Sequence, residues 1–252
     1  MYGQLLQKID RKQARVGIIG MGYVGLPLAE VFCSAGFPTL GFDIDAEKIN
    51  KLNAGKSYIE HIPTPRIKLM RKNGLFEASC DAKTLHDCDA LIICVPTPLG
   101  KSRDPDMTYI VKTGETIVKQ LRKGQLVVLE STTYPGTTRE VLVPILEKSG
   151  LKASKDFFVA FSPEREDPGR KDYTTGTIPK IVGGLDAKSG KLATTLYARA
   201  VKAVVPVSSC DIAEAAKIVE NVYRCVNIAM VNELKMVFER MGIDVWEVIE
   251  AA

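Results

Sequence analysis

Three glycines, Gly20, Gly22 and Gly25, form a GxGxxG pattern directly after a short apolar run and at the start of a helical pattern. In such a turn the first glycine permits a sharp bend, the second lets the backbone approach a pyrophosphate, and the third allows close packing of helix on strand. The positive end of the helix attracts the anion. The pattern favours a phosphate-binding turn over the alternative, a glycine turn in an α/β protein that binds no nucleotide.

An acidic residue, Asp43, ends the next apolar run. At about 20 residues beyond a glycine-rich turn, a carboxylate holds the ribose hydroxyls of an adenosine and repels a 2′-phosphate. Glycine turn and carboxylate together predict a binding site for NAD rather than NADP.

Two further segments follow apolar runs and so belong at the same edge of a sheet, where the cofactor would lie. In the segment 94–98, Thr97 stands between two prolines and could bond a ribose or a phosphate; an ordinary loop at the end of a strand would look similar. In the segment 131–133, hydroxyl groups, that of Thr132 included, would face a nicotinamide; ordinary helix capping by Ser and Thr is the alternative.

Two more candidate sites each contain a charged residue. Glu164 follows a buried run and a proline, which places it better for activating a water than a carboxylate at a loop tip, although such charged segments are usually just solvated. Lys217 and Asn221 are four residues apart on a long helical pattern and therefore share a face. They could donate together to an alkoxide or oxyanion, or simply face solvent.

The elements that would position these residues alternate between short apolar runs and helical patterns. Continuous apolar runs are typical of strands buried on both faces of a parallel sheet. We therefore predict a doubly wound, mostly parallel α/β (Rossmann-like) domain over residues 1–208. The predicted strands are 15–20, 39–43, 90–95, 126–130, 157–161, 180–184 and 202–207.

A long helix is predicted next, within a second domain over 209–252. Asp211 and Glu214 fit a capping box, and Gly242 supplies the left-handed stop after Met241, so the helix has about 30 residues and a length of about 45 Å. Apolar residues cover most of its circumference, which predicts packing against a second copy of the chain in a homodimer. Asp244 repeats the capping signal for a further helix.

Composition and charge argue against several other classes of function. The net charge is +4, with 34 basic and 30 acidic residues interspersed, which argues against a nucleic-acid partner. The six cysteines show no C-x-x-C pair and the chain has two histidines, so no metal site is indicated. We expect reduced thiols in a cytosolic protein without a membrane span.

Six ordered motifs resemble those of the UDP-glucose/GDP-mannose dehydrogenase family, and the form of the fifth is more similar to the branch that acts on UDP-N-acetylhexosamines. The motifs are GMGYVGLPLA, FDID, CVPTP, ESTTYPGTT, SPEREDPG and AEAAKIVENVYR.

The resemblance implies that NAD twice oxidises the C6 alcohol of a UDP-sugar, such as UDP-N-acetylglucosamine, through a thiohemiacetal and a thioester, for surface polysaccharide synthesis. It implies that Thr132 and Glu164 order and activate the hydrolytic water and that Lys217 with Asn221 stabilises the oxyanion. The residues that match cofactor-binding positions are Gly20, Met21, Gly22, Tyr23, Val24, Gly25, Asp43, Lys48, Val95, Pro96, Thr97 and Thr132.

Two departures from the family pattern stand out. Pro168 replaces a second glutamate of the glucose-oxidising branch, which favours the hexosamine branch. The family's nucleophilic cysteine lies in a glycine-rich segment beyond the central helix, before a UDP-binding domain, and none of the six cysteines has such a context. We therefore expect a fragment that binds NAD and dimerises but does not turn over a UDP-sugar.

Two other functions remain open. A β-hydroxyacid dehydrogenase also joins a dinucleotide-binding domain to a helix with Lys and Asn four apart, and it would oxidise a small hydroxyacid without a cysteine. A non-catalytic NAD sensor or assembly module would bind NAD saturably and catalyse nothing.

Overall fold

A computed structural model describes residues 1–60, 62–101, 103–165 and 178–252 of the chain. These residues form two compact units, Met1–Glu214 and Ala215–Ala252. The first unit contains an eight-stranded sheet in the order β3-β2-β1-β4-β5-β6-β7-β8. Its strands are β1 Val16–Ile19, β2 Thr39–Phe42, β3 Phe76–Ser79, β4 Ala90–Ile93, β5 Leu126–Leu129, β6 Phe158–Phe161, β7 Lys180–Gly184 and β8 Val204–Val207.

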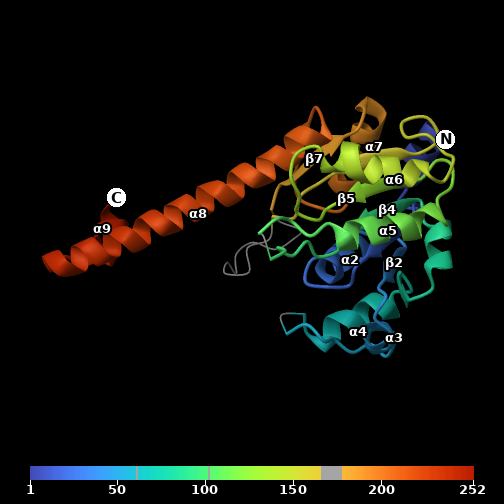
Figure 1. Ribbon diagram of the computed structural model, residues 1–252. Helices are drawn as coiled ribbons and strands as arrows, with labels where there is room; N and C mark the ends of the chain where they lie inside the picture. The colour runs from blue at the N-terminus through green and yellow to red at the C-terminus, as the bar shows by residue number, and fades with distance from the viewer. Residues whose placement is uncertain (61, 102, 166–177) are drawn as a thin grey trace. The chain divides into compact units, whose positions relative to one another are not determined.

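All neighbouring strands of the sheet pair in parallel except β6 and β7, which are antiparallel. The predicted doubly wound, mostly parallel fold is confirmed, and each of the seven predicted runs contains a strand. The strand β3 was missed because it is the outermost strand of the sheet and its residues alternate between buried and exposed positions. No continuous apolar run therefore marks it in the sequence. Figure 1 shows the strands side by side with helices around them.

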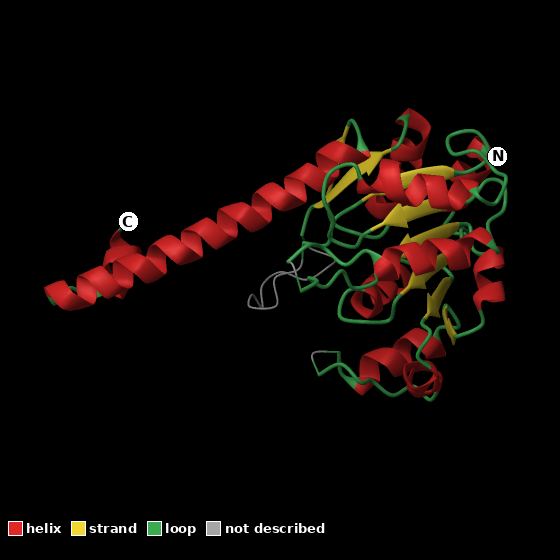
Figure 2. Ribbon diagram, in the orientation of Figure 1, coloured by secondary structure: helices red, strands yellow, loops and turns green. Residues whose placement is uncertain are grey.

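Helices cover both faces of the sheet (Figure 2). On one face, Leu5, Phe32 and Leu196, from α1, α2 and α7, join alternate strand residues in a single apolar core. On the other, α5 packs against α6. The helices of the first unit are α1 Tyr2–Asp10, α2 Gly25–Ser34, α3 Ala46–Asn53, α4 Thr64–Lys72, α5 Thr108–Val118, α6 Val143–Glu147 and α7 Ala187–Ala198, with short helices at Ala82–Asp87 and Thr138–Leu142.

The helix α8 spans Cys210–Met241, as the hydrophobic pattern predicted, and ends before Gly242 at a φ of +71°. The predicted capping box is wrong. Ser209 accepts the hydrogen bond from the Ile212 amide, and the carboxylate of Glu214 is bonded to the segment before α6 instead. Asp244 does cap the following helix, α9 Val245–Ala251, by accepting from the Trp246 amide at 2.8 Å.

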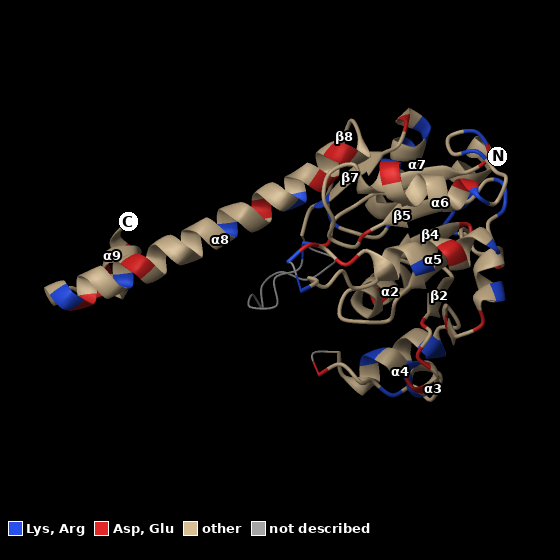
Figure 3. Cartoon of the chain, viewed as in Figure 1, with Lys and Arg blue, Asp and Glu red and all other residues tan. Residues whose placement is uncertain are grey.

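Charged residues of both signs are interspersed over the elements, as Figure 3 shows. Among the described residues, no helix combines the length and apolarity that crossing a membrane demands. All six cysteines are free thiols, and four of them are buried.

Candidate active site

The carboxyl ends of β1, β2, β4, β5 and β6 lie along one edge of the sheet, since these strands are parallel. The strand β1 pairs with β4, and the strand order reverses between them: β2 and β3 lie beyond β1 on one side, and β5 and β6 lie beyond β4 on the other. In open α/β sheets a crevice forms outside the strand ends at such a reversal, and ligands bind there. The segments singled out in the first unit, from Gly20 to Glu164, all follow strands at this edge.

The glycine turn connects β1 to α2, and its three glycines meet different surroundings. Gly20 has a φ of +96°, and a Cβ on Gly25 would lie 1.9 Å from the carbonyl oxygen of Gly20. A Cβ on Gly22 would meet no described atom within 4 Å. Two glycines are thus required by the fold itself, whereas the middle one leaves open space beside the backbone.

The amino end of α2 faces this open space. Among the described side chains, none caps the helix at Val24. Its first N–H groups carry the positive end of the helix dipole and suit a phosphate. The turn therefore fits the pyrophosphate of a dinucleotide.

Asp43 lies beside the turn, with 8% of its surface exposed. One carboxylate oxygen accepts a hydrogen bond from the Met21 amide at 2.8 Å, and the other accepts from the Asp45 amide at 3.0 Å. The ammonium of Lys48 is 3.5 Å from the first oxygen. These contacts hold the carboxylate next to the turn, where it is placed to accept from ribose hydroxyls.

Tyr58 braces the same turn from outside the glycine motif. Its hydroxyl donates to the carbonyl oxygen of Met21 at 2.5 Å. Burial, together with the nearby Asp43 and Asp45, raises the pKa of Tyr58 far above its ordinary value, so the hydroxyl stays a donor. No sequence pattern marks this residue, because Tyr58 lies in a loop after α3.

The loops after β4 and β5 are tied together. The hydroxyl of Thr97 donates to the carbonyl oxygen of Thr132 at 2.8 Å, and that of Ser131 donates to the carbonyl oxygen of Val95 at 2.7 Å. Thr133 is buried, and its hydroxyl has no hydrogen-bond partner among the described residues. Thr132 itself is half-buried, so its side chain remains accessible at the edge of the sheet.

A buried ion cluster lies where β5, β6 and β7 meet. The ammonium of Lys180 is 2.8 Å from Glu130 and 3.4 Å from Glu164, and the hydroxyl of Tyr197 also donates to Glu130. Lys180 is only 2% exposed, although most lysine side chains in folded proteins are solvated. Sequence reasoning identified Glu164 and missed its three neighbours.

Burial and charge act in opposite directions in this cluster. Burial raises the pKa of Glu130. Burial alone would lower the pKa of Lys180, but the carboxylates of Glu130 and Glu164 outweigh it and raise that pKa. Lys180 is therefore a permanent cation at neutral pH. Cys94 lies close by, and burial raises the pKa of its thiol well above the ordinary value, which makes it a poor nucleophile.

Glu214, at the start of α8, fixes the segment that follows Thr132. Its carboxylate accepts from the Gly136 amide at 2.6 Å and from the amide and hydroxyl of Thr138 at 2.9 and 2.7 Å. Glu214 is fully buried. The loop after β5 is thus held at both ends, by the Thr97 contact and by Glu214.

The second unit contains Lys217 and Asn221. They occupy one face of α8, since they are four residues apart, and Lys217 is buried while Asn221 is half-buried. Their juxtaposition with Thr132 and Glu164 stays a prediction. Pro168, on which the choice of branch partly depends, lies outside the described residues.

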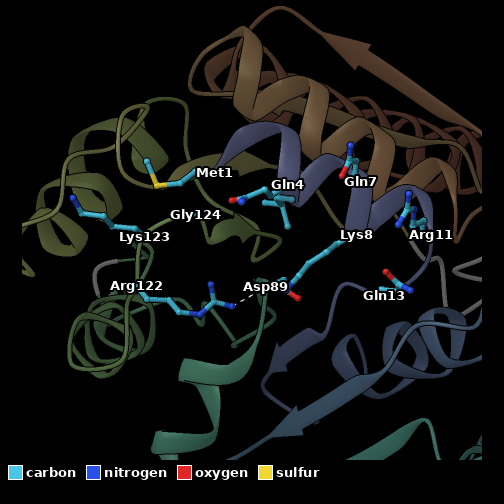
Figure 4. Close-up of a pocket in the computed structure, with 11 residues that line it drawn as sticks. Met1, Gln4, Gln7, Lys8, Arg11, Gln13, Asp89, Arg122, Lys123 and Gly124 are labelled. Atoms are coloured by element: carbon cyan, nitrogen blue, oxygen red, sulfur yellow. Dashed lines mark hydrogen bonds and ion pairs between the residues drawn. The ribbon is translucent and has the colours of Figure 1, made fainter.

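A pocket of about 460 Å³ lies at the opposite edge of the sheet, between α1 and the segments before β4 and β5. Figure 4 shows Lys8 and Arg122 reaching Asp89 from different elements, at 2.9 and 3.0 Å. The Arg15 amide also donates to Asp89. These contacts attach the amino-terminal helix to the sheet, far from the cofactor edge.

Comparison with known proteins shows the family to which the chain belongs. Residues 14–201 match the model of the NAD-binding domain of the UDP-glucose/GDP-mannose dehydrogenase family, and residues 211–252 match the model of its central domain. A UDP-N-acetyl-D-glucosamine 6-dehydrogenase of Pseudomonas aeruginosa is 40% identical over 96% of this chain and 57% of its own length.

Solved structures of similar fold are also nucleotide-sugar dehydrogenases. A UDP-D-ManNAc dehydrogenase from Pyrococcus horikoshii superposes with a TM-score of 0.88 and 38% identity, over 94% of this chain and 57% of that one. A ternary complex of GDP-mannose dehydrogenase from Pseudomonas aeruginosa has a TM-score of 0.87 and 33% identity, over 94% and 56%. The chain spans about half the length of these relatives. It belongs to the UDP-glucose/GDP-mannose dehydrogenase family and contains that family's NAD-binding domain.

Proposed function

We propose that this chain is the NAD-binding and central portion of a UDP-N-acetylhexosamine 6-dehydrogenase, with UDP-N-acetylglucosamine as its substrate. The sugar's C6 alcohol, two NAD⁺ and one water give the C6 carboxylate, two NADH and three protons. NAD supplies the hydride acceptor for both oxidations. The product would be a uronic acid for a surface polysaccharide.

One observation carries the proposal: a carboxylate suited to a ribose and a carboxylate suited to a water stand at the same edge of one sheet. Asp43 follows β2, beside the glycine turn, and Glu164 follows β6, on the other side of the strand reversal. An extended dinucleotide bound across that reversal has its adenosine near the first and its nicotinamide toward the second.

The site residues would divide the work as follows. Glu164, with Thr132, would orient the water that releases the acid and accept its proton, since a general base must lie within hydrogen-bond reach of the proton it takes. Lys217 and Asn221 would donate to the oxygen at C6 as negative charge develops there. Asp43 and the glycine turn would hold the cofactor.

A panel of substrates tests this assignment. The full-length polypeptide of which this chain is proposed to be a portion is incubated with NAD and UDP-N-acetylglucosamine, UDP-N-acetylmannosamine or UDP-glucose, and NADH formation is followed by its absorbance. We expect two NADH for each UDP-N-acetylhexosamine consumed, and little reaction with UDP-glucose. NADH formation that requires a small hydroxyacid instead would exclude the proposal and favour a β-hydroxyacid dehydrogenase.

Lys217→Ala is the matching variant. We expect it to abolish NADH formation while the melting temperature and the affinity for NAD stay unchanged, because the lysine would act on the substrate oxygen and not on the fold. Lys235→Ala, on the same helix, serves as the control. Full activity of Lys217→Ala would show that the helix assignment is wrong.

The proposed assembly is a homodimer through α8. Exposed apolar side chains line this helix, including Val219 at 66%, Val222 at 55% and Val226 at 60%. Such a surface is costly to leave in water and is typical of an interface. Sedimentation should give a dimer for the chain and a monomer for Val226→Asp. A monomeric parent chain would rule out this interface.

A further inference from the structure

The sheet contains one reversed strand, and its direction explains how a lysine reaches the cofactor edge. Since β7 runs antiparallel to β6, its first residue lies at the edge where β5 and β6 end. The pairing aligns Phe161 with Gly183, and the same register continued outward brings Glu164 opposite Lys180. The contact between their charged groups, 3.4 Å, agrees with this register.

Lys180 is held from behind by two buried side chains. The carboxylate of Glu130, which is fully buried, lies 2.8 Å from the ammonium, and the ring centroid of Tyr197 lies 5.7 Å from it. The Tyr197 hydroxyl donates to the other oxygen of Glu130. Glu130 directly precedes the Ser131–Thr133 segment, so the same cluster also touches the loop after β5.

Taking three charged groups out of water is costly, and replacing a buried ion pair by apolar residues is often neutral or stabilising. A fold that needed only stability here could therefore use apolar side chains. What an apolar cluster could not provide is a fixed cation beside Glu164. The carboxylate of Glu164 meets Lys180 through one oxygen and accepts a hydrogen bond from the Arg165 amide at 2.7 Å through the other, and its side chain is 14% exposed.

We propose that Lys180, anchored by Glu130 and Tyr197, is a positioning residue that fixes the carboxylate of Glu164 for its work on water. This inference rests on the proposed function, in which Glu164 acts as the base. In this role Lys180 would act through Glu164 and not directly on substrate or cofactor. A glutamate on a loop has several rotamers, and a fixed partner selects the one that faces the reacting atoms.

The first test concerns geometry and needs no catalysis. When the chain is labelled with nitrogen and carbon isotopes, NMR detects the ammonium group of Lys180. It also detects scalar couplings across hydrogen bonds between this ammonium nitrogen and carboxylate carbons. We expect slow exchange with water and couplings to both Glu130 and Glu164, and Glu164→Gln should remove the latter alone. Absence of any coupling to Glu164 would overturn the inference, even in an active enzyme.

The second test is a double-mutant cycle measured by steady-state kinetics. It uses the full-length polypeptide of which this chain is proposed to be a portion, with UDP-N-acetylglucosamine and NAD as substrates. Lys180→Met should lower kcat by on the order of a hundredfold with little change in KM, as misplacing a catalytic group does. In a Glu164→Gln background the same change should lower kcat by less than about threefold more, because a residue that acts through another is not additive with it.

Folding is controlled in two ways. Glu130→Gln/Lys180→Met removes both charges of the buried pair and so leaves no unpaired ion, and it should repeat the kinetic result if Lys180→Met alone unfolds. Lys8→Met makes the same change at the opposite edge of the sheet and should leave kcat unchanged. Equal losses of kcat in the presence and absence of Glu164 would show a purely structural role and contradict the proposal. Inactivity of the parent polypeptide would count against the proposed function, while the NMR result would still decide the pairing.

Discussion

The carboxylate of Asp43 accepts a hydrogen bond from the backbone N–H of Met21 at 2.8 Å, inside the glycine turn. The contact joins the end of β2 to the loop after β1, so the two features that suggest a dinucleotide are mechanically one. A cofactor that touched one of them would meet the other without a conformational change.

Replacing this carboxylate should weaken cofactor binding. Asp43→Ala removes an acceptor for ribose hydroxyls, and a hydrogen bond to a charged group contributes ~1.5–3 kcal/mol, so NAD affinity should fall about 10- to 100-fold. Preference over NADP should fall too, because the 2′-phosphate is no longer repelled. Calorimetry with both cofactors measures these changes. Asp45→Ala is the control: it removes the cap of α3 and should lower stability by ~1 kcal/mol while NAD binding persists.

The three glycines should differ when each receives a methyl group. Gly25→Ala places a Cβ 1.9 Å from the Gly20 oxygen, so unfolding should become easier by at least ~2 kcal/mol. Gly22→Ala meets no described atom within 4 Å, so stability should hold. Its methyl would occupy the pyrophosphate's space and weaken NAD binding by about tenfold or more, ~1.4 kcal/mol. Unchanged NAD affinity in Gly22→Ala would argue against a phosphate at this turn.

Much of this edge could be predicted from the sequence, and the parts that could not share a cause. Continuous apolar runs mark buried strands, and glycine spacing marks the turn, because both depend on local residues. The direction of β7 does not, since an apolar run looks the same whichever way it pairs. The sequence therefore placed Lys180 at the start of a predicted strand without indicating that its ammonium would lie beside Glu164. Tyr58 and Glu214 were missed as contacts because their partners, Met21 and Thr138, are distant in sequence.

Glu214 should prove more important to stability than its neighbour Asp211. Glu214→Gln turns an amide donor toward the Gly136 and Thr138 donors in a fully buried site, and an unsatisfied buried group costs ~1–3 kcal/mol. Asp211→Asn breaks only a partly exposed ion pair with Arg139, worth less than ~1 kcal/mol. Urea denaturation of both variants compares them. Equal losses would mean that the Glu214 contacts do not form in solution.

Asp89 should make stability depend on pH. Burial would raise its pKa, but hydrogen bonds from Lys8, the Arg15 amide and Arg122 outweigh it and hold the pKa of Asp89 below its usual range. Its contribution is therefore fully present above an unfolded-state pKa of about 4 and is lost as pH falls through the lower native value. The difference in unfolding free energy between the parent chain and Asp89→Asn should be ~1–3 kcal/mol at pH 7 and shrink below about pH 4. A difference independent of pH would contradict this account.

A crystal structure of the chain with NAD tests the central claim most directly. We expect the adenosine ribose on the carboxylate of Asp43, the pyrophosphate at the amino end of α2 beside Gly22, and the nicotinamide on the side of Thr132 and Glu164. Density for NAD elsewhere on the chain, or an adenosine ribose turned away from Asp43, would contradict the account.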